Sequence, residues 1–289
     1  MYTYSVSIEG WNSGCQELAK DFWWRVVSRG RRHYDVCMGI RGLLLDLDGT
    51  LYVGGEPVEG AREAVGSLEA SGFAVRYVTN TTRNPRGWVR ERLVGMGFEV
   101  GEAEIFTPAR AAAGRIGSGT CFALVDDSLL EDFGGLNMTD DHPNYVLVGD
   151  LGEGFTYDRL NPAFRHLMEG AELLALQKNR YWQTEVGLSM DAGPFVAALE
   201  YASGKRASVV GKPERDFFRL ALEDLGLEAH EVAMVGDDAE ADVIGARRAG
   251  LVGIQVRTGK WQGDAAEADL VLDSIAELPG AVQFEGGGL

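Results

Sequence analysis

The sequence has few of the residues that build disulfide frameworks or metal clusters. Its three cysteines, Cys15, Cys37 and Cys121, lack the Cys-x-x-Cys spacing of zinc and redox motifs. This usage is typical of a reducing compartment, so we expect a cytoplasmic protein without a cysteine metal site. The four histidines are scattered along the chain, and we interpret all of them as surface or structural residues: His33, His142, His166 and His230.

Positive charge and long apolar runs are also scarce. The formal net charge is −17, from 27 Lys and Arg against 44 Asp and Glu, which argues against nucleic acid or an anionic membrane as a partner. No apolar run approaches the ~18 residues of a membrane span. Only five basic residues are lysines, so a lysine within a motif is informative.

Short apolar runs alternate with amphipathic stretches along most of the chain, which is typical of α/β folds with a parallel sheet. The composition, 45% hydrophobic and 25% charged, is that of a globular protein. We expect strands over 42–45, 73–78, 105–107, 121–125, 145–148, 172–176, 207–210, 231–235, 252–256 and 268–272. We expect helices over 60–71, 85–95, 108–116, 127–133, 158–168, 213–225 and 239–249.

The clearest motif is the apolar run that starts at Gly42 and leads into Asp46, Asp48 and Gly49. A run of this kind predicts a strand buried on both faces, and ligands bind beyond the carboxyl ends of such strands. Two acids this close repel each other unless a cation or a shared proton lies between them. The alternative interpretation is a helix cap followed by a turn.

Three other predicted strand ends also carry polar residues. Thr79 and Asn80 follow one strand, Lys212 follows another, and a third leads into three acids: Asp237, Asp238 and Asp242. Taken singly, these residues are explained as a cap, a turn and an N-cap. Because the carboxyl ends of parallel strands meet at one edge, we expect them to converge.

Phosphoryl transfer through an aspartyl phosphate is the chemistry that this residue set favours. A carboxylate can act as the nucleophile, and a second acid can protonate the leaving group. Repulsion between carboxylate and phosphate requires a hard divalent cation with oxygen ligands, and Mg²⁺ fits. Hydroxyl, amide and ammonium groups can hold the phosphoryl oxygens.

The ordered motifs resemble those of the haloacid dehalogenase (HAD) superfamily over residues 38–278. Leu45-Asp46-Leu47-Asp48-Gly49-Thr50 is similar to its motif I, Thr79-Asn80 to motif II, Gly211-Lys212-Pro213 to motif III, and Gly236-Asp237-Asp238 with Asp242 to motif IV. The long insert between motifs II and III resembles the C2 cap of subclass IIA. The resemblance implies a Rossmann-like core with a parallel sheet and an inserted α/β cap.

The resemblance also implies a role for each motif residue. Asp46 is expected to be the nucleophile and a Mg²⁺ ligand, and Asp48 the general acid/base that gives Mg²⁺ its backbone carbonyl. Thr79, Asn80 and Lys212 are expected to bind phosphate, and Lys212 also to orient Asp46. Asp237 is expected to ligate Mg²⁺, with Asp238 and Asp242 supporting the metal site or Lys212.

We expect the HAD-like core to comprise residues 38–116 and 206–289, and the cap residues 117–205. Residues 1–37 differ in composition, and we interpret them as an N-terminal extension, with Met38 as the hypothetical true start. Cap residues that are candidates for facing the substrate are Asp150, Glu153, Tyr181 and Trp182, although surface or packing roles explain them equally well.

The leading hypothesis is a Mg²⁺-dependent phosphatase acting on a small phosphorylated molecule. One alternative is a signalling receiver that is phosphorylated on aspartate without turnover, and another is a binding module that kept the fold. The substrate and the oligomeric state cannot be read from the sequence, although homodimers through the cap are common in the subclass.

Overall fold

A computed structural model describes residues 39–184 and 187–282 of the chain. The expectation of an extension over residues 1–37 therefore lies outside the described residues. Among the helices that are described, none has the length and apolar character needed to cross a membrane.

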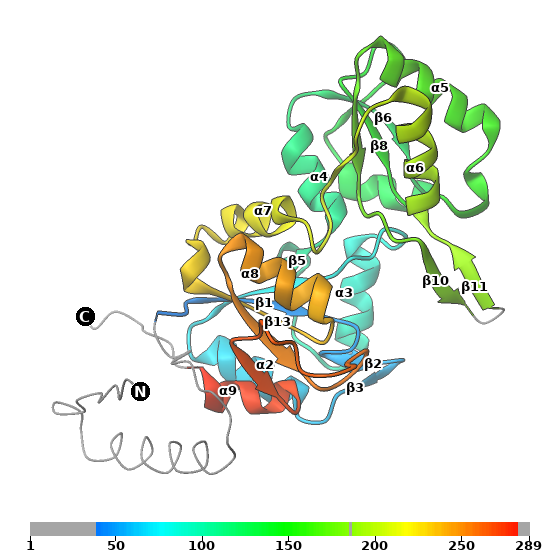
Figure 1. Ribbon diagram of the computed structural model, residues 1–289. Coiled ribbons are helices and arrows are strands. Elements are labelled where there is room, and N and C mark those ends of the chain that lie inside the picture. The colour runs from blue at the N-terminus through cyan, green and yellow to red at the C-terminus, as the bar shows by residue number, and fades with distance from the viewer. Residues whose placement is uncertain (1–38, 185–186, 283–289) are drawn as a thin grey trace, which may run out of the picture. The chain divides into compact units, whose positions relative to one another are not determined.

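The first sheet has six parallel strands in the order β15-β14-β13-β1-β4-β5 (Figure 1). Strand β1 pairs with β13 on one side and with β4 on the other, so the motifs that follow these three strands meet at one edge. The strands are β1 (Gly42–Asp46), β4 (Ala74–Val78), β5 (Ile105–Phe106), β13 (Val232–Gly236), β14 (Val252–Val256) and β15 (Leu270–Leu272).

Strand β1 is buried on both faces because helices cover both sides of this sheet. Leu43 and Leu45 belong to a core cluster with residues of α2 (Ala61–Ala70), α3 (Arg86–Gly95) and α9 (Leu278–Ala281). Leu44 points to the opposite face, as strand alternation requires. It belongs to the cluster that includes α4 (Pro108–Ile116), α7 (Arg215–Leu225) and α8 (Gly245–Ala249).

The second sheet has five parallel strands in the order β12-β9-β8-β6-β7. Leu124, Val146 and Val148 form its own core with residues of two helices, α5 (Tyr157–Glu169) and α6 (Ala192–Ser203). Figure 1 shows these two helices beside β6 and β8. The strands are β6 (Thr120–Leu124), β7 (Asn137–Met138), β8 (Tyr145–Val148), β9 (Glu172–Ala175) and β12 (Ser208–Val209).

The expected fold class is confirmed: an α/β core with a parallel sheet and an inserted α/β unit. Strand β12 comes from the segment that we assigned to the core, but it pairs with β9 of the second sheet. The domain boundaries stay a prediction.

Two antiparallel pairs complete the described strands: β2 (Tyr52–Val53) with β3 (Glu56–Pro57), and β10 (Tyr181–Thr184) with β11 (Gly187–Met190).

Local differences from the expected elements have identifiable causes. The stretch 127–133 forms 3₁₀ turns, which begin where the Asp126 carboxylate accepts a hydrogen bond from Ser128 N. The expected helix 239–249 starts with π-helical turns over 239–244. Helix α6 was missed because Gly193 and Pro194 interrupt its pattern, yet proline is tolerated in a first turn.

Candidate active site

Three of the predicted motif residues lie at the carboxyl ends of the central strands. Asp46 is the last residue of β1, Thr79 follows β4 directly, and Asp237 follows β13. The parallel pairing of β1 with β4 and β13 brings these three strand ends together. The convergence expected from the sequence is therefore present, as open α/β sheets favour.

The Lys212 side chain lies between two carboxylates at this edge. Its Nζ is 2.5 Å from Asp46 Oδ1 and 2.6 Å from Asp242 Oδ1, and Lys212 is only 5% exposed. Asn80 holds the main chain of Lys212, because Asn80 Nδ2 donates to Lys212 O and Lys212 N donates to Asn80 Oδ1, both at 2.8 Å. Motifs I, II, III and IV are thus joined by side-chain contacts.

For these groups, burial and the nearest opposite charge shift the pKa in opposite directions. Burial raises the pKa of Asp46 in spite of the neighbouring Lys212 ammonium. Burial raises the pKa of Asp242 to about 7 against the same ammonium. For Lys212, burial acts to lower the pKa, but the carboxylates of Asp242 and Asp46 have the larger effect. The pKa of Lys212 is therefore raised. A buried ammonium between two carboxylates stays charged.

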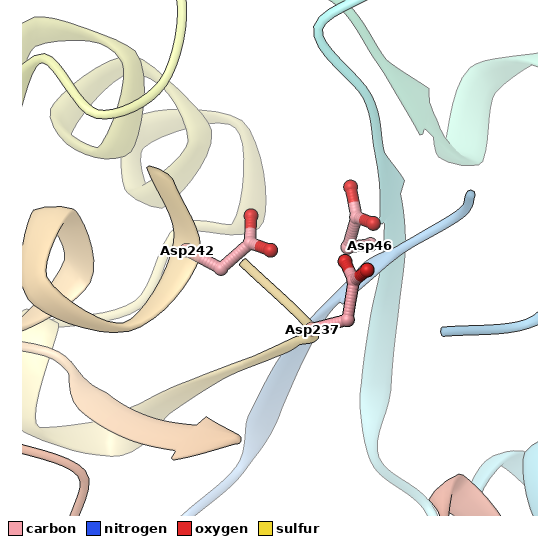
Figure 2. Close-up of side chains that lie close together, drawn as sticks. All are labelled: Asp46, Asp237 and Asp242. Atoms are coloured by element: carbon pink, nitrogen blue, oxygen red, sulfur yellow. The ribbon is translucent and has the colours of Figure 1, made fainter. Parts of the chain in front are cut away.

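Three buried acids, Asp46, Asp237 and Asp242, present carboxylate oxygens within 4.8 Å of one another. Figure 2 shows Asp46 and Asp237 at the ends of their strands, with Asp242 on the helical segment beside them. Lys212 pairs with two of the three carboxylates, Asp46 and Asp242, and burial raises the pKa of the third, Asp237. A divalent cation would balance the cluster, and its all-oxygen donors suit a hard ion such as Mg²⁺.

Glycines make room for the Asp237 carboxylate. A Cβ atom on Gly49 would lie 2.0 Å from Asp237 Oδ2, and one on Gly259 would lie 2.2 Å from the same oxygen. The backbone of Lys260 donates to this oxygen at 2.5 Å. The φ angles of Gly49 and Gly259 are 101° and 58°. These positive values are adopted readily by glycine and rarely by residues with a side chain. Asp237 is therefore enclosed by main chain and held in one position.

The remaining predicted acids differ in their surroundings. Asp48 is exposed and lines a cavity of about 490 Å³ together with Asp46 and Lys212. Asp238 accepts hydrogen bonds from Glu240 N and Ala241 N, so it caps the helical segment that follows. Its own backbone N–H donates to Asp242 Oδ2 at 3.1 Å. Thr79 and Asn80 are half-buried and line the same cavity.

Sequence reasoning missed several residues of this cavity: Tyr52, Trp88, Arg92 and Lys260. The Arg92 guanidinium lies 4.7 Å from the Tyr52 ring centre and 5.4 Å from that of Trp88. The Arg257-Thr258-Gly259-Lys260 turn after β14 was the available signal for Lys260. This turn is held in place by a hydrogen bond that Thr258 Oγ1 donates to Gly49 O.

The candidate substrate-facing residues of the insert do not line this cavity. Asp150 is buried, accepts a hydrogen bond from Gly152 N at 2.9 Å and lies 3.1 Å from Arg83 Nε. Glu153 is exposed, and Tyr181 is 55% exposed. The Trp182 side chain lies outside the described residues.

Comparison with known proteins identifies the class. The family described as haloacid dehalogenase-like hydrolase matches residues 43–138, and a second, HAD-hydrolase-like, matches residues 209–278. The haloacid dehalogenase-like hydrolase domain-containing protein 2 of Bos taurus is 44% identical, with 80% of this chain and 89% of the relative covered. The chain belongs to the haloacid dehalogenase-like hydrolase family.

Two further comparisons support the same class. The phospholysine phosphohistidine inorganic pyrophosphate phosphatase of Bos taurus is 41% identical, over 83% of this chain and 93% of the relative. The solved structure of a p-nitrophenyl phosphatase from Archaeoglobus fulgidus superposes with a TM-score of 0.77 at 28% identity, over 84% of this chain and 99% of that one. The expected enzyme class, a phosphatase-type hydrolase of this family, is confirmed.

Proposed function

We propose that the protein is a Mg²⁺-dependent phosphatase that hydrolyses a small phosphorylated substrate through a phosphoryl group carried on Asp46. The observation that supports this most strongly is the contact between the Asp46 carboxylate and the Lys212 ammonium, beside Asp237 and at the mouth of a cavity. This arrangement fixes the direction of one carboxylate and leaves it open to a phosphate.

Asp46 acts as the nucleophile. Lys212 contacts Asp46 Oδ1, which leaves Oδ2 to attack phosphorus in line with the leaving oxygen. The P–O bond to the leaving group breaks as the bond from Asp46 to phosphorus forms. Water then cleaves the phosphoryl group from Asp46 and restores the carboxylate.

Asp48 acts as the general acid and then as the general base. It is exposed at the cavity, two residues beyond Asp46, where a leaving group and a water molecule can both reach it. It gives its proton to the leaving oxygen in the first step and takes a proton from water in the second. Such proton transfers contribute about 10²–10⁴-fold to a rate.

The phosphoryl oxygens are held by Thr79, Asn80 and Lys212. Thr79 and Asn80 line the cavity beside Lys212, and the Asn80 carboxamide also keeps the Lys212 main chain in place. Donors that are already positioned stabilise the charge that develops during transfer. Asp242 accepts a second hydrogen bond from Lys212, and Asp238 orients Asp242 through its backbone N–H.

Mg²⁺, when bound, neutralises the carboxylate–phosphate repulsion and polarises the phosphoryl group. Asp46 and Asp237 would hold it through carboxylate oxygens, with the Asp48 backbone carbonyl as a third protein ligand. The enclosure of Asp237 by Gly49 and Gly259 fits a ligand that must not move.

The substrate is a small phosphorylated molecule, and the relatives named above make aryl phosphates, phospho-amino acids and pyrophosphate reasonable probes. The inserted unit, proposed over residues 117–205, would cover the cavity and exclude water. The proposal includes a homodimer formed through this unit. It includes no binding to nucleic acid or to a membrane.

Release of inorganic phosphate from p-nitrophenyl phosphate with Mg²⁺ tests the function. We expect many turnovers per chain, dependence on Mg²⁺, and loss of at least about 10³-fold in rate for Asp46→Asn. The alternative, a receiver that is phosphorylated once without turnover, predicts that release stops at one equivalent. A binding module predicts no release at all.

A further inference from the structure

The Arg92 guanidinium lines the active-site cavity but has no part in the reaction proposed above. Arg92 lies in the last turn of α3, is half-buried and shares the cavity with Asp46 and Asp48. Its Nη2 donates to Gly54 O at 2.8 Å, which is the single hydrogen bond that this side chain makes within the described residues. A guanidinium has five N–H donors, so others remain for a ligand.

Aromatic rings, and not carboxylates, hold this guanidinium in place. No Asp or Glu of the described part of the chain forms an ion pair with Arg92, whereas Arg86, at the start of the same helix, pairs with Asp132. The Arg92 guanidinium lies instead over the rings of Tyr52 and Trp88, 4.7 Å and 5.4 Å from their centres. Such cation–π contacts orient a cation without neutralising it. Arg92 therefore keeps a positive charge that can attract an anion.

Tyr52 places this charge on the side of the cavity where Asp48 lies. The backbones of Asp48 and Tyr52 form a β-bridge, and Gly49 N donates to Tyr52 O at 2.7 Å. A general acid must be within hydrogen-bond reach of the oxygen that it protonates. The leaving group therefore begins on the side of the cavity where Tyr52 and Arg92 lie.

Trp88 adds an apolar surface to the same part of the cavity. It lies four residues before Arg92 on α3, so the two side chains share one face of the helix. The Trp88 side chain is 42% exposed and lines the cavity, whose volume of about 490 Å³ is in the range of small-ligand sites. An exposed ring beside a cation suits a leaving group with a short carbon skeleton and an acidic group.

We propose that Arg92 binds an acidic group, a carboxylate or a second phosphate, carried by the leaving group of the substrate. The inference rests on the proposed phosphatase function and narrows its substrate class to small phosphorylated acids. The planar fork of guanidinium donors matches the oxygens of both acidic groups. In a chain with a net charge of −17, a cation at this position also offsets the repulsion between the protein and a substrate with two anionic groups.

Matched pairs of substrates test the inference in the full-length protein with Mg²⁺. Phosphoglycolate is compared with its amide, and 4-phosphooxybenzoate with its amide, so that each pair differs by one negative charge at nearly constant size. The bisphosphate of 1,3-propanediol is compared with the monophosphate, which distinguishes a phosphate from a carboxylate as the bound group. We expect kcat/KM to be at least about tenfold higher for the acidic member of at least one pair, mainly through a lower KM.

Substitutions on α3 show whether Arg92 causes this preference. Arg92→Gln should remove most of it, because the amide can still donate hydrogen bonds but carries no charge. Arg92→Lys should retain part of it, because the charge remains and the planar fork does not. The matched control is Arg90→Gln, which removes an exposed arginine of the same helix that does not line the cavity. This control should keep the wild-type preference, which separates direct contact from overall charge.

Failure of this inference can be distinguished from failure of the proposed function. Turnover of p-nitrophenyl phosphate without a preference for the acidic member of any pair would overturn the inference alone, as would a preference that survives Arg92→Gln. Absence of all turnover would overturn the proposed function. Calorimetric binding of the same pairs would then decide the inference: tighter binding of the acid that Arg92→Gln abolishes supports it, and equal or undetectable binding overturns it.

Discussion

The Lys212 ammonium lies 2.5 Å from Asp46 Oδ1 although 166 residues separate the two in the chain. The contact depends on the whole order of the first sheet, which sets β1 beside β13 and β4, and on Asn80, which holds the Lys212 backbone. Lys212 also contacts Asp242, so one buried cation is shared between two buried acids. The stability of the fold and the proposed activity therefore depend on the same side chain.

Replacing Lys212 with methionine should destabilise the fold and abolish activity. The change leaves Asp46 and Asp242 buried without their cation, and breaking a buried pair costs about 3–5 kcal/mol of unfolding free energy. Urea unfolding in the presence of a chelator measures the loss. The double variant Lys212→Met with Asp242→Asn should recover part of it. Equal stability of Lys212→Met and wild type would show that the ammonium does not offset the acids.

Replacing Asp48 with asparagine should affect substrates according to their leaving groups. The amide cannot donate the proton that a poor leaving group requires, so we expect a loss of about 10²–10⁴-fold with an alkyl phosphate. With p-nitrophenyl phosphate the loss in the first step should be much smaller, because nitrophenolate leaves without protonation. The rate at which the leaving alcohol or nitrophenol is released in the first turnover makes the comparison, because this product appears before the hydrolysis step. An equal loss with both would remove Asp48 from the role of acid.

Alanine at Gly49 should displace Asp237 and weaken Mg²⁺ binding at least about tenfold, because the new Cβ would lie 2.0 Å from Asp237 Oδ2. Gly54→Ala is the matched control, since Gly54 also has a positive φ, 68°, but has nothing within 4 Å of the added atom. Its cost should be limited to about 1–2 kcal/mol of backbone strain. The Mg²⁺ dependence of activity and the melting temperature separate the two effects. Similar Mg²⁺ requirements in both variants would contradict the steric account.

Stability should fall as pH rises above about 9. Burial raises the pKa of the Cys121 thiol from 9.0 to about 12 and that of Tyr52 from 10.0 to about 12. The pKa of Lys212 is also raised, because Asp242 and Asp46 outweigh the opposing effect of burial. In each case the folded state retains a proton that the unfolded chain releases, so the stabilisation is complete below the unfolded pKa and is lost as pH increases.

Urea unfolding between pH 8 and about 11 measures this slope. In Cys121→Ala the slope above pH 9 should be shallower, because one of the proton-retaining groups is gone. Cys121 should also resist thiol reagents at neutral pH in the Cys15→Ser, Cys37→Ser background, since it is completely buried. A pH-independent stability over this range would contradict the predicted shifts.

Three of the candidate-site motifs were predictable from the sequence because each follows an apolar run that forms a strand of the first sheet. Asp46, Thr79 and Asp237 could be placed at one sheet edge from that pattern alone. The packing of Gly49 and Gly259 around Asp237 could not, because it depends on the loop after β14 crossing the loop after β1. Local patterns carry no information about such crossings.

The second sheet was harder to predict from the sequence. Strand β12 has two residues, and its pairing with β9 is decided by tertiary packing rather than by its own sequence. The short β10–β11 pair lacked a turn signal that would have distinguished it from a loop.

The central claim is that Asp46 carries the phosphoryl group during turnover. Acid quenching of the enzyme with substrate and Mg²⁺, followed by borohydride reduction and peptide mass spectrometry, tests it directly, because reduction converts a phosphorylated aspartate to homoserine. The account predicts homoserine at position 46 in the wild type, and none in Asp46→Asn. Turnover without modification of Asp46, or with homoserine at another aspartate, would contradict it.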